Sequence, residues 1–430
     1  MQIINCTQAG FEPELDKIYR REAVPPEVDE AVKDILAEIK RDGDTALTKF
    51  AEKFDRIKLS PAQFRVSDQD IAAAESGVSA EWKNAITSAL ANIVSFAEQR
   101  IPKDWKYSPR PGVVIGERFE PMERIGVYIP GGTAPLVSTV LHTAGIAKAA
   151  GVKEIVAVTP PGQDGMIHPA VLWAMRKAGV NEIYRLGGVC GVGALAYGTA
   201  TIRKVDKIVG PGNAWVTAAK KQVYGHVALD MVAGPSEIMI IADDSARADF
   251  IAADMLSQAE HGSGLEHAVL VTTDAGLIEK VQNELDIQKQ RLSRGTMVDK
   301  VLKDGVSLIL VKDLADAIEI AGKYAPEHLE IMCRDAESTA GKIKAAGAIF
   351  IGEWTPEPVG DFCAGPSHVL PTAGSGRYFS GLTVEGFFRR MSTIQYTQTA
   401  IQQEIPVIAA FSEMEGLDAH GNSGKIRGSK

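Results

Sequence analysis

The sequence predicts an α/β protein with two parallel-sheet domains, a helical N-terminal region and a helical C-terminal tail. Three observations support this class. The chain has 430 residues, more than a single simple core organises. Its composition, 45% hydrophobic and 23% charged, is typical of a soluble globular protein. From about residue 113 onward, short β-rich runs alternate with helical segments, which indicates parallel sheets covered by helices.

The region before this alternation is expected to be helical. Residues 26–105 contain two stretches, 27–54 and 67–100, in which apolar residues recur every three to four positions. Ser67 followed by Asp70 resembles a capping box near the start of the second stretch. We therefore expect several amphipathic helices before the first parallel strand.

The alternating region divides into two comparable blocks, about 125–240 and 240–352. The β-rich runs are RIGVYI, EIVAVT, EIYRL and DKIVG in the first block, and EIMIIAD, HAVLVTT, SLILVKD and GAIFIG in the second. Helical segments such as STVLHTAGIAKAAG, PAVLWAMRKAG and NAWVTAAKKQVYG lie between runs. We interpret the blocks as a duplication of a Rossmann-like unit whose dinucleotide fold is incomplete, because no GxGxxG fingerprint is present.

These patterns predict four parts of the chain. Residues 1–25 form an N-terminal arm, and the helical region 26–125 packs with residues 240–376 to form one α/β domain. Residues 126–239 form the second Rossmann-like domain. Residues 377–430 return to helix as a C-terminal tail with a polar, glycine-containing end, and such a tail either frays or docks on another surface.

Charge, cysteine usage and hydropathy exclude several classes of protein. The net charge of −9 argues against nucleic-acid binding, which needs a basic surface. Four cysteines without a CxxC motif fit a reducing compartment, and the N-terminus lacks an export signal, so we expect a cytoplasmic protein. Residues 125–147 lack charged side chains, but the prolines and glycines of YIPGGTAP would leave backbone groups unpaired in lipid. We expect no membrane span.

Gln258 and His261 lie three residues apart at the end of a predicted helix, in the stretch DMLSQAEHGSG. This spacing places both side chains on one side of the helix, and the following glycines end it. Either the pair binds a metal ion or it forms a hydrogen-bonded cap. Oxygen and imidazole donors without cysteine suit zinc or a similar divalent ion. The zinc-protease motif HExxH is absent.

Other candidate side chains lie at turns rich in glycine and proline. Asp361 and His368 share the loop VGDFCAGPSHVLP, and the tail segment EGLDAHGNSG contains Glu415 and His420. Glu327 and His328 follow Pro326. These two residues either begin a helix or serve two separate proton transfers around one substrate.

Two glycine-rich turns, IPGGTAP and VGPGNAW, follow predicted strands and lead into helices. Such turns can bind a dinucleotide pyrophosphate through backbone NH groups, although tight strand-to-helix connections explain them nearly as well. Cys190 and Cys363 could act as nucleophiles toward an aldehyde. Packing as small apolar groups is the favoured interpretation, because no neighbouring residue argues for a lowered pKa.

Taken together, the motifs resemble the ordered signature of the histidinol dehydrogenase family. The resemblance extends from about residue 25 to about 424 through GVYIPGGTAPLVSTVLHTAGIAKAAGV, KIVGPGNAWVTAAKKQVYG, DMVAGPSEIMIIAD, LSQAEHG, YAPEHLEI, VGDFCAGPSHVLPT and EGLDAHGNS. It implies oxidation of L-histidinol to L-histidine through L-histidinal, the last steps of histidine biosynthesis. The implied cofactors are one zinc ion per subunit and NAD. The oxidation of one histidinol molecule uses two molecules of NAD+.

The resemblance also implies roles for particular residues. Glu327 and His328 match the family's proton acceptors. The implied zinc ligands are Gln258, His261, Asp361 and His420. The implied substrate contacts are Ser236, Gln258, His261, His328, Asp361, Glu415 and His420, with Ser138 and His368 as further pocket residues. The implied NAD-side positions, in domain 126–239, are Tyr128, Asn213 and Cys190, which stands where the family usually has glutamine.

Finally, the resemblance implies a homodimer whose active sites are shared between chains. The tail is then expected to be domain-swapped, with Glu415 and His420 reaching the neighbouring chain's site. Cys190 leaves open a divergent paralogue that oxidises another amino alcohol or a diol with NAD. A metallohydrolase and a non-catalytic metal-binding or scaffold protein are the remaining alternatives.

Overall fold

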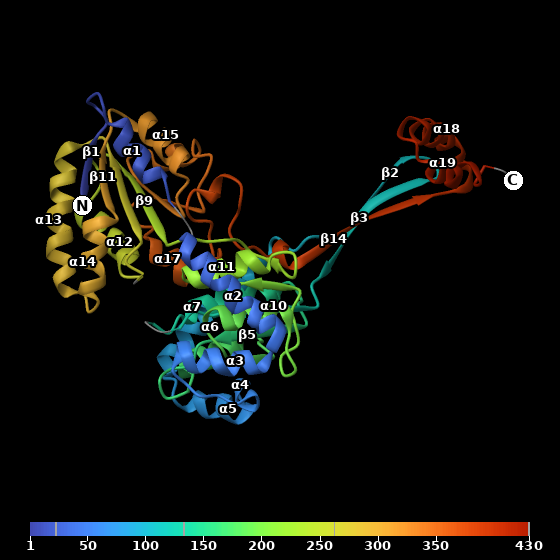
Figure 1. The fold of residues 1–430 in the computed structure, drawn as a ribbon. Coiled ribbons are helices and arrows are strands. Elements are labelled where there is room, and N and C mark those ends of the chain that lie inside the picture. Colours follow the sequence, from blue (N-terminus) through green and yellow to red (C-terminus); the bar gives the residue numbers. More distant parts are fainter. Residues whose placement is uncertain (22–23, 132–133, 262, 429–430) are drawn as a thin grey trace.

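The computed structural model describes residues 1–21, 24–131, 134–261 and 263–428. It contains two sheet-based domains and an extended arm that projects from one of them (Figure 1). No helix in the described part of the chain is long and apolar enough to cross a membrane.

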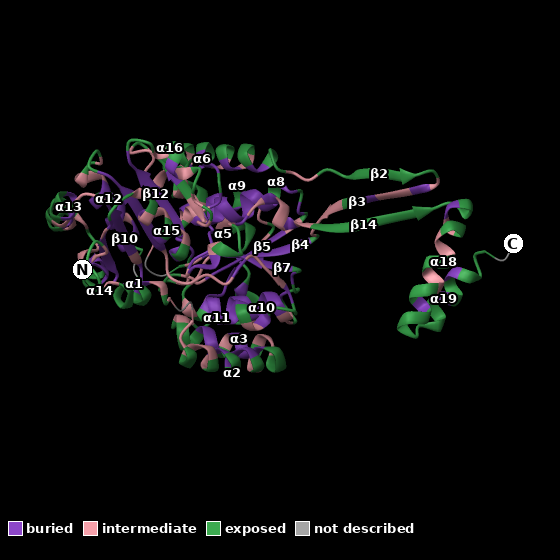
Figure 2. Ribbon diagram, turned by 90° about the horizontal axis from the view of Figure 1, so that it is seen from above, coloured by how far each residue is buried: buried purple, intermediate pink, exposed green. Residues whose placement is uncertain are grey.

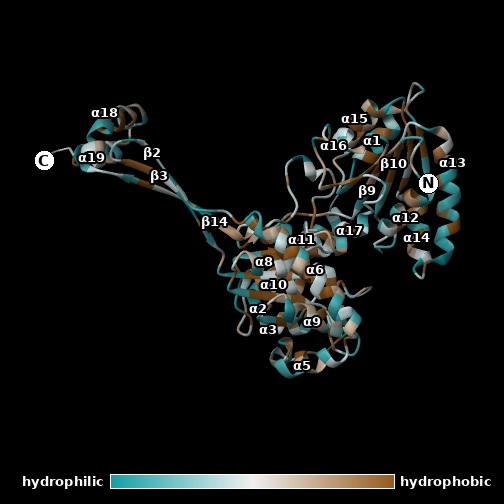
Figure 3. Cartoon of the chain, turned by 180° about the vertical axis from the view of Figure 1, so that it is seen from behind, coloured by the Kyte–Doolittle hydropathy of each residue, from teal (hydrophilic) through white to brown (hydrophobic). Residues whose placement is uncertain are grey.

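The first sheet has six parallel strands in the order β1-β11-β10-β9-β12-β13. Their bounds are β1 (Gln2–Asn5), β9 (Glu237–Ala242), β10 (His267–Thr272), β11 (Val306–Leu310), β12 (His328–Met332) and β13 (Ala348–Ile351). Helices cover both faces, so the central strands are buried and predominantly hydrophobic (Figure 3). One face packs against α12 (Ala248–Ala259), α13 (Ala275–Gln288) and α14 (Gly295–Asp304), and the other against α1 (Glu12–Tyr19) and α15 (Leu314–Tyr324).

The second sheet has five parallel strands in the order β6-β5-β4-β7-β8. Their bounds are β4 (Arg124–Tyr128), β5 (Glu154–Thr159), β6 (Glu182–Arg185), β7 (Lys207–Val209) and β8 (Ala228–Leu229). Numbered within its own block, each sheet reads 3-2-1-4-5, with β1 added at the edge of the first. This is the order of a dinucleotide-binding sheet without its sixth strand. The expected duplication and the incomplete Rossmann-like fold are therefore confirmed.

The N-terminal helices cover the five-stranded sheet. One face packs against α2 (Pro26–Asp42), α3 (Asp44–Phe50), α10 (Gly188–Tyr197) and α11 (Ala214–Val223). The other packs against α6 (Ala80–Glu98), α9 (Pro169–Lys177) and the segment α7 (Val137–Val140), η2 (Leu141–Gly145) and α8 (Ile146–Ala149). The shorter α4 (Pro61–Phe64) and α5 (Asp68–Ser76) contact β6 and α9.

This packing corrects the expectation that residues 26–125 join residues 240–376 in one domain. Helix α2 instead lies on α10, where a Cβ added at Gly193 would come within 3.0 Å of Ile39 and 3.2 Å of Leu36. Small residues on α10 let the apolar face of α2 approach closely, which favours the five-stranded domain. The predicted N-terminal arm likewise begins as part of a domain, because β1 pairs with β11 at the edge of the six-stranded sheet.

The extended arm consists of an antiparallel sheet and two helices at its far end. The sheet is formed by β2 (Trp105–Arg110), β3 (Val113–Pro121) and β14 (Phe388–Tyr396), in the order β14-β3-β2. Helices α18 (Gln398–Glu415) and α19 (Asp418–Lys425) pack on each other and are largely exposed (Figure 2). The tail expected to be helical therefore begins with a nine-residue strand before its helices.

Candidate functional site

The candidate site lies between the two sheet domains, at the amino-terminal ends of β9 and β12. Helix α17 (Glu357–Phe362) supplies carboxylates, and the end of α12 supplies Gln258. The π-helix η2 of the other domain supplies His142, whose Nε2 is 3.0 Å from the main-chain oxygen of Asp361. A π-helical turn within the expected helix 138–151 is a local irregularity of a kind that is frequent at functional sites.

His328 is the first residue of β12, so the alternative of a helix beginning after Pro326 is wrong. Its Nδ1 is 3.0 Å from the main-chain oxygen of Glu237 and donates to it, which leaves Nε2 as the basic nitrogen. Nε2 is buried and finds no hydrogen-bond partner among the described residues. It faces Asp361 Oδ1 at 3.8 Å. Burial lowers the pKa of His328, so the ring is neutral near pH 7.

Glu327 lies beside His328 in sequence but does not hydrogen-bond to it. Its Oε2 is 3.8 Å from His328 Nδ1, beyond hydrogen-bond range, and accepts the main-chain NH of Glu237 at 2.9 Å. Burial raises the pKa of Glu327 well above its usual value, and the charges of Glu237 and Asp361 add to this effect. A carboxylate with a raised pKa is suited to act as a general base near neutral pH.

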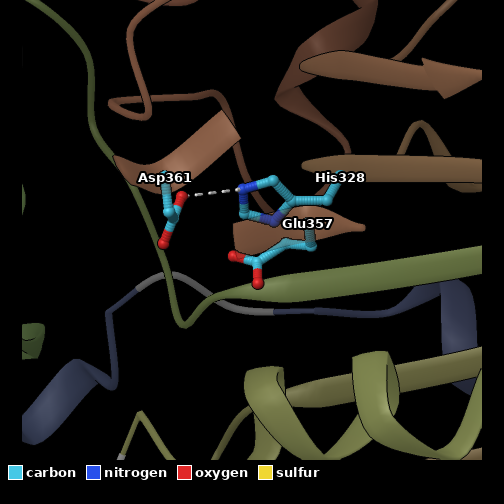
Figure 4. A group of neighbouring side chains, drawn as sticks. All are labelled: His328, Glu357 and Asp361. Carbon is cyan, nitrogen blue, oxygen red and sulfur yellow. Dashed lines mark ion pairs between the residues drawn. The ribbon is translucent and has the colours of Figure 1, made fainter. Parts of the chain in front are cut away.

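Asp361 and Glu357 lie four residues apart on α17 and point toward His328 (Figure 4). Ligand atoms of these three residues lie within 4.8 Å of one another. Burial raises the pKa of Asp361 well above its usual value, and Glu357 raises it further through its charge and a hydrogen bond. Ser257 donates a 2.9 Å hydrogen bond to the Glu357 carboxylate.

Glu357 was absent from the sequence-based candidates. No recognised motif contains it, yet one signal could have revealed it. Glu357 precedes Asp361 by four residues in WTPEPVGDF, a spacing that places both side chains on the same face of a helix.

Gln258 and His261 do lie together, as their spacing predicted. Gln258 is on the last turn of α12, fully buried, and its Nε2 is 3.4 Å from His261 Nδ1. His261 follows the helix end, is exposed, and its Nδ1 is 3.3 Å from the main-chain oxygen of Ser257. The glycines at 262 and 264 were expected to end the helix. Position 262 lies outside the described residues, and Gly264 has a positive φ of 72°.

His368 and His142 complete the buried part of the site. Their rings stack with centroids 4.4 Å apart, and His368 Nδ1 is 3.7 Å from Asp361 Oδ1. Burial lowers the pKa of His142 to about 4 and that of His368 well below its usual value. Ser138 is four residues before His142 on the same helical segment, and Ser236 directly precedes β9.

The donor set fits a cation. Several buried donor or acceptor atoms around Asp361 lack a hydrogen-bond partner in the part of the chain that the structure describes. These atoms are His328 Nε2, Glu357 Oε1 and His368 Nε2, and Gln258 Oε1, at the end of α12, lacks a partner too. Buried polar atoms are normally satisfied, so several orphans around one carboxylate indicate a ligand. Amide, imidazole and carboxylate groups are ligands for zinc and related divalent ions.

Glu415 and His420 are not brought to this site within one chain. Glu415 ends α18 and His420 lies in α19, and both are exposed at the end of the arm, far from α17 (Figure 1). One implied zinc ligand, His420, and two implied substrate contacts, Glu415 and His420, are therefore remote from the other site residues.

The NAD-side residues gather in the five-stranded domain. Tyr128 ends β4, and its hydroxyl accepts the main-chain NH of Gly188 at 3.1 Å. Asn213 caps α11 by accepting from the NH groups of Trp215 and Val216. Tyr128 lies at the carboxyl end of β4 and Asn213 follows that of the adjacent strand β7, where the strand order reverses. Dinucleotides bind at this switch point in such sheets.

Cys190 lies in the hydrophobic core of the five-stranded domain. It is 2% exposed within the core beside α2 and the sheet, and burial raises its pKa to about 12. The thiol is therefore a poor nucleophile, and the packing interpretation holds for it. Contact of Cys190 with a coenzyme, as its matched position implies, stays a prediction.

The comparisons with known proteins agree with this arrangement. The family model described as histidinol dehydrogenase matches residues 18–428. A histidinol dehydrogenase from Heliobacterium mobile is 45% identical over 396 residues, covering 92% of each chain. One from Gloeobacter violaceus is 46% identical and covers 92% of this chain and 89% of that relative.

Solved structures give the same result. The crystal structure of histidinol dehydrogenase from Elizabethkingia anophelis has a TM-score of 0.93 and 36% identity, and the match covers 99% of this chain and 98% of that one. An acetylating aldehyde dehydrogenase from Geobacillus thermoglucosidasius, with a TM-score of 0.51 and 16% identity, covers 89% of this chain and 94% of that one and shows a shared fold alone. The chain belongs to the histidinol dehydrogenase family, and it is an oxidoreductase of that family.

Proposed function

We propose that this protein catalyses the zinc- and NAD-dependent, four-electron oxidation of L-histidinol to L-histidine through L-histidinal. The observation that carries the proposal is the buried cluster of His328, Glu357 and Asp361 next to Glu327, and the contact of Gln258 with His261 at the end of α12 supports it. The test is direct: purified protein, zinc, NAD and histidinol should yield two NADH per histidine formed. Absence of NADH formation with histidinol would reject the proposal.

Gln258, His261 and Asp361 would hold the zinc ion, with His420 from a second copy of the chain as the fourth protein ligand. The unpartnered Gln258 Oε1 supports this assignment. Bound zinc would anchor the substrate's amine and imidazole nitrogens. His328 is not assigned as a ligand, although it lies in the cluster with Glu357 and Asp361, because its Nε2 is needed as a base. H261A should abolish zinc binding, whereas H328N should retain it.

The first oxidation would use His328. Its Nδ1 is held by the carbonyl of Glu237, so the neutral ring presents Nε2 to the alcohol. Nε2 takes the hydroxyl proton as the hydride of the carbinol carbon passes to NAD+, which gives the aldehyde, NADH and a proton.

The second oxidation would use Glu327. The carboxylate removes a proton from water as the water oxygen adds to the aldehyde carbon, which gives the hydrate as its anion while Glu327 holds the proton. A second hydride then passes to a fresh NAD+, and the carboxylic acid forms. Keeping the aldehyde bound between the two steps makes the second one local, which raises its effective concentration.

NAD would bind where Tyr128 and Asn213 flank the switch point between β4 and β7. The main chains that follow β4 and β7 lie close together at this point, because a Cβ added at Gly210, whose φ is 119°, would come within 2.3 Å of the main-chain oxygen of Tyr128. Lys220 donates a hydrogen bond of 2.8 Å to the carbonyl of Gly210 and so stabilises the turn after β7.

The active enzyme would be a homodimer with a swapped arm. The arm ends in helices with exposed apolar side chains, which are unfavourable in water and suited to a partner surface. Those on α18 are Val407, Phe411 and Met414. Docking of this end on a second copy would bring Glu415 and His420 to the site that lacks them.

Mixing two inactive variants tests the sharing of sites. H420A and H261A should each be inactive alone. Random subunit exchange should make about half of the dimers heterodimers, and each heterodimer would have one complete site of its two. The mixture should therefore recover about a quarter of wild-type activity. Mixtures that stay inactive after verified subunit exchange would place each site within one chain.

The alternative of a paralogue acting on another amino alcohol or a diol is not favoured, because relatives at 45% identity are histidinol dehydrogenases. Comparing kcat/KM for histidinol, other amino alcohols and short diols tests it. A metallohydrolase or a non-catalytic metal-binding or scaffold protein would show no NAD reduction in the same assay. Histidine biosynthesis would place the enzyme in the cytoplasm.

A further inference from the structure

A buried ion pair lies directly behind the proposed proton acceptors. Arg21, delivered by the N-terminal segment that follows α1, places Nη1 2.6 Å from Glu237 Oε2. The two side chains are 4% and 1% exposed. The guanidinium carbon lies 3.6 Å from the centroid of the Tyr324 ring, and Nη2 donates to the carbonyl of Tyr324. Arg21 therefore bridges the start of β9 to the chain three residues before Glu327.

Glu237 in turn contacts both proposed proton acceptors through its backbone. Its NH donates to Glu327 Oε2 at 2.9 Å, and its carbonyl accepts from His328 Nδ1 at 3.0 Å. Its second carboxylate oxygen accepts the main-chain NH of Ala373 at 2.9 Å. One residue thus orients the carboxylate of Glu327 and fixes the tautomer of His328.

The backbone next to this ion pair is strained. Among the described residues, the non-glycine residues with positive φ are Arg56, Ala325 and Ala373. Ala325, at φ 48°, directly follows Tyr324, and Ala373, at φ 53°, donates to Glu237. Left-handed backbone is unfavourable for alanine and persists where surrounding contacts enforce it. Ala325 thus follows the residue whose carbonyl accepts from Arg21, and Ala373 itself donates to Glu237.

We propose that Arg21 is a positioning residue for the reaction: by tying Glu237 to Tyr324, it sets the placement of Glu327 and His328. This inference rests on the proposed roles of those two residues. Arg21 itself touches neither of them and is no catalytic group. Its effect passes through the backbone of Glu237 and the strained turn at Ala325.

Three variants test this role. R21M removes the bridge but leaves the Glu237 carboxylate buried without its partner. R21M/E237Q also removes that unpaired charge, and the glutamine oxygen still accepts from the main-chain NH of Ala373. R20M changes the neighbouring, exposed arginine and is the matched control. We expect R21M to lower both Tm and kcat, and R20M to leave both unchanged.

The double variant separates positioning from stability. R21M/E237Q should recover most of the Tm while kcat stays at least about tenfold low, with the KM for histidinol within about twofold, because small displacements of reacting groups can reduce rates by up to about 100-fold. Recovery of kcat together with Tm would overturn the proposal, since the pair would then act through stability alone.

Coupling to Glu327 gives the second criterion. In the aldehyde half-reaction, R21M/E237Q should cost little further activity in an E327Q background, because the residue that it positions is already disabled. Fully additive losses would overturn the proposal. A readout independent of turnover is the imidazole Nδ1–H resonance of His328, which should shift or exchange faster in R21M/E237Q. If wild-type protein does not oxidise histidinol, the proposed function fails, and this resonance still tests the positioning contact.

Discussion

Glu327 and His328 are neighbours in sequence with different environments, and this difference is the basis of the separate roles proposed for them. His328 is neutral because burial lowers its pKa, and its Nδ1 is committed to the carbonyl of Glu237. Glu327 is a buried carboxyl with a strongly raised pKa and no hydrogen bond to His328. Pairs of titratable groups with unlike surroundings are a recurrent device for acid–base chemistry.

Replacing each residue should therefore impair a different half-reaction. H328N should slow histidinol oxidation by about 10²–10⁴-fold, and E327Q should slow histidinal oxidation by a similar factor, the usual contribution of one general base. The two half-reactions are measured separately, each with its own substrate. E337Q, at an exposed position in α16 (Ala336–Ala340), is the control. Equal losses in both half-reactions for both variants would contradict the assignment.

For individual residues, the sequence predicted contacts correctly where the two residues lie close together along the chain. The spacing of Gln258 and His261 predicted their contact, and the environment of Cys190 agreed with packing. The contacts of Glu327 with Glu237 and of Arg21 with Tyr324 join distant positions, and no local pattern indicates which distant side chains meet. Glu357 was missed although its spacing from Asp361 was visible.

At the scale of elements, hydrophobic runs identified strands that are continuous in apolar residues and missed strands that carry polar or charged ones. Every β-rich run in the two blocks forms a strand, because buried parallel strands are continuous in valine and isoleucine. Strand β12 was missed because it begins with a histidine after a proline and contains the buried Glu330. The arm strand β14 was missed because it is mostly exposed on both faces and carries two arginines.

A buried carboxyl pair between α12 and β12 predicts a dependence of stability on pH. Burial raises the pKa of Asp254 to about 6, and Glu330, its hydrogen-bond partner, is raised well above its usual value. Because the folded pKa of Asp254 exceeds the unfolded one, its contribution is full below about pH 4 and is lost as pH rises through about 6, by about 3 kcal/mol at most.

D254N should reduce this loss. In denaturant titrations from pH 4 to pH 8, the free energy of unfolding of D254N should fall less with pH than that of wild-type protein. D304N, at an exposed position, should follow the wild-type curve. Parallel curves for wild type and D254N would show that Asp254 does not titrate as described.

The packing of α2 on α10 makes a prediction about Gly193. A Cβ there already lies 3.0 Å from Ile39, so G193V should overpack the contact and lower the free energy of unfolding by about 1–3 kcal/mol. G322A is the matched control, because Gly322 lies in helix α15 with nothing within 4 Å of the added Cβ. It should stabilise the protein by up to about 1 kcal/mol. A neutral G193V measured by denaturant unfolding would contradict close α2–α10 packing.

At the scale of the whole molecule, the order 3-2-1-4-5 recurs in both sheets, but the two domains are used differently. The candidate site lies at the amino ends of β9 and β12, whereas the turns proposed to bind the coenzyme lie at the carboxyl ends of β4 and β7. Sequence periodicity indicated two sheets, yet it assigned the N-terminal helices to the wrong one. Periodicity reports which face of a helix is buried and carries no information on which sheet buries it.

The central claim is that Gln258, His261 and Asp361 bind one divalent ion together with His420 from a second copy of the chain, next to His328. Anomalous diffraction from crystals of the zinc-loaded protein, collected at the zinc absorption edge, tests it most directly. We expect one strong peak per chain, bounded by those four side chains, with the arm of one chain reaching the other. A peak elsewhere, or a site completed within a single chain, would contradict it.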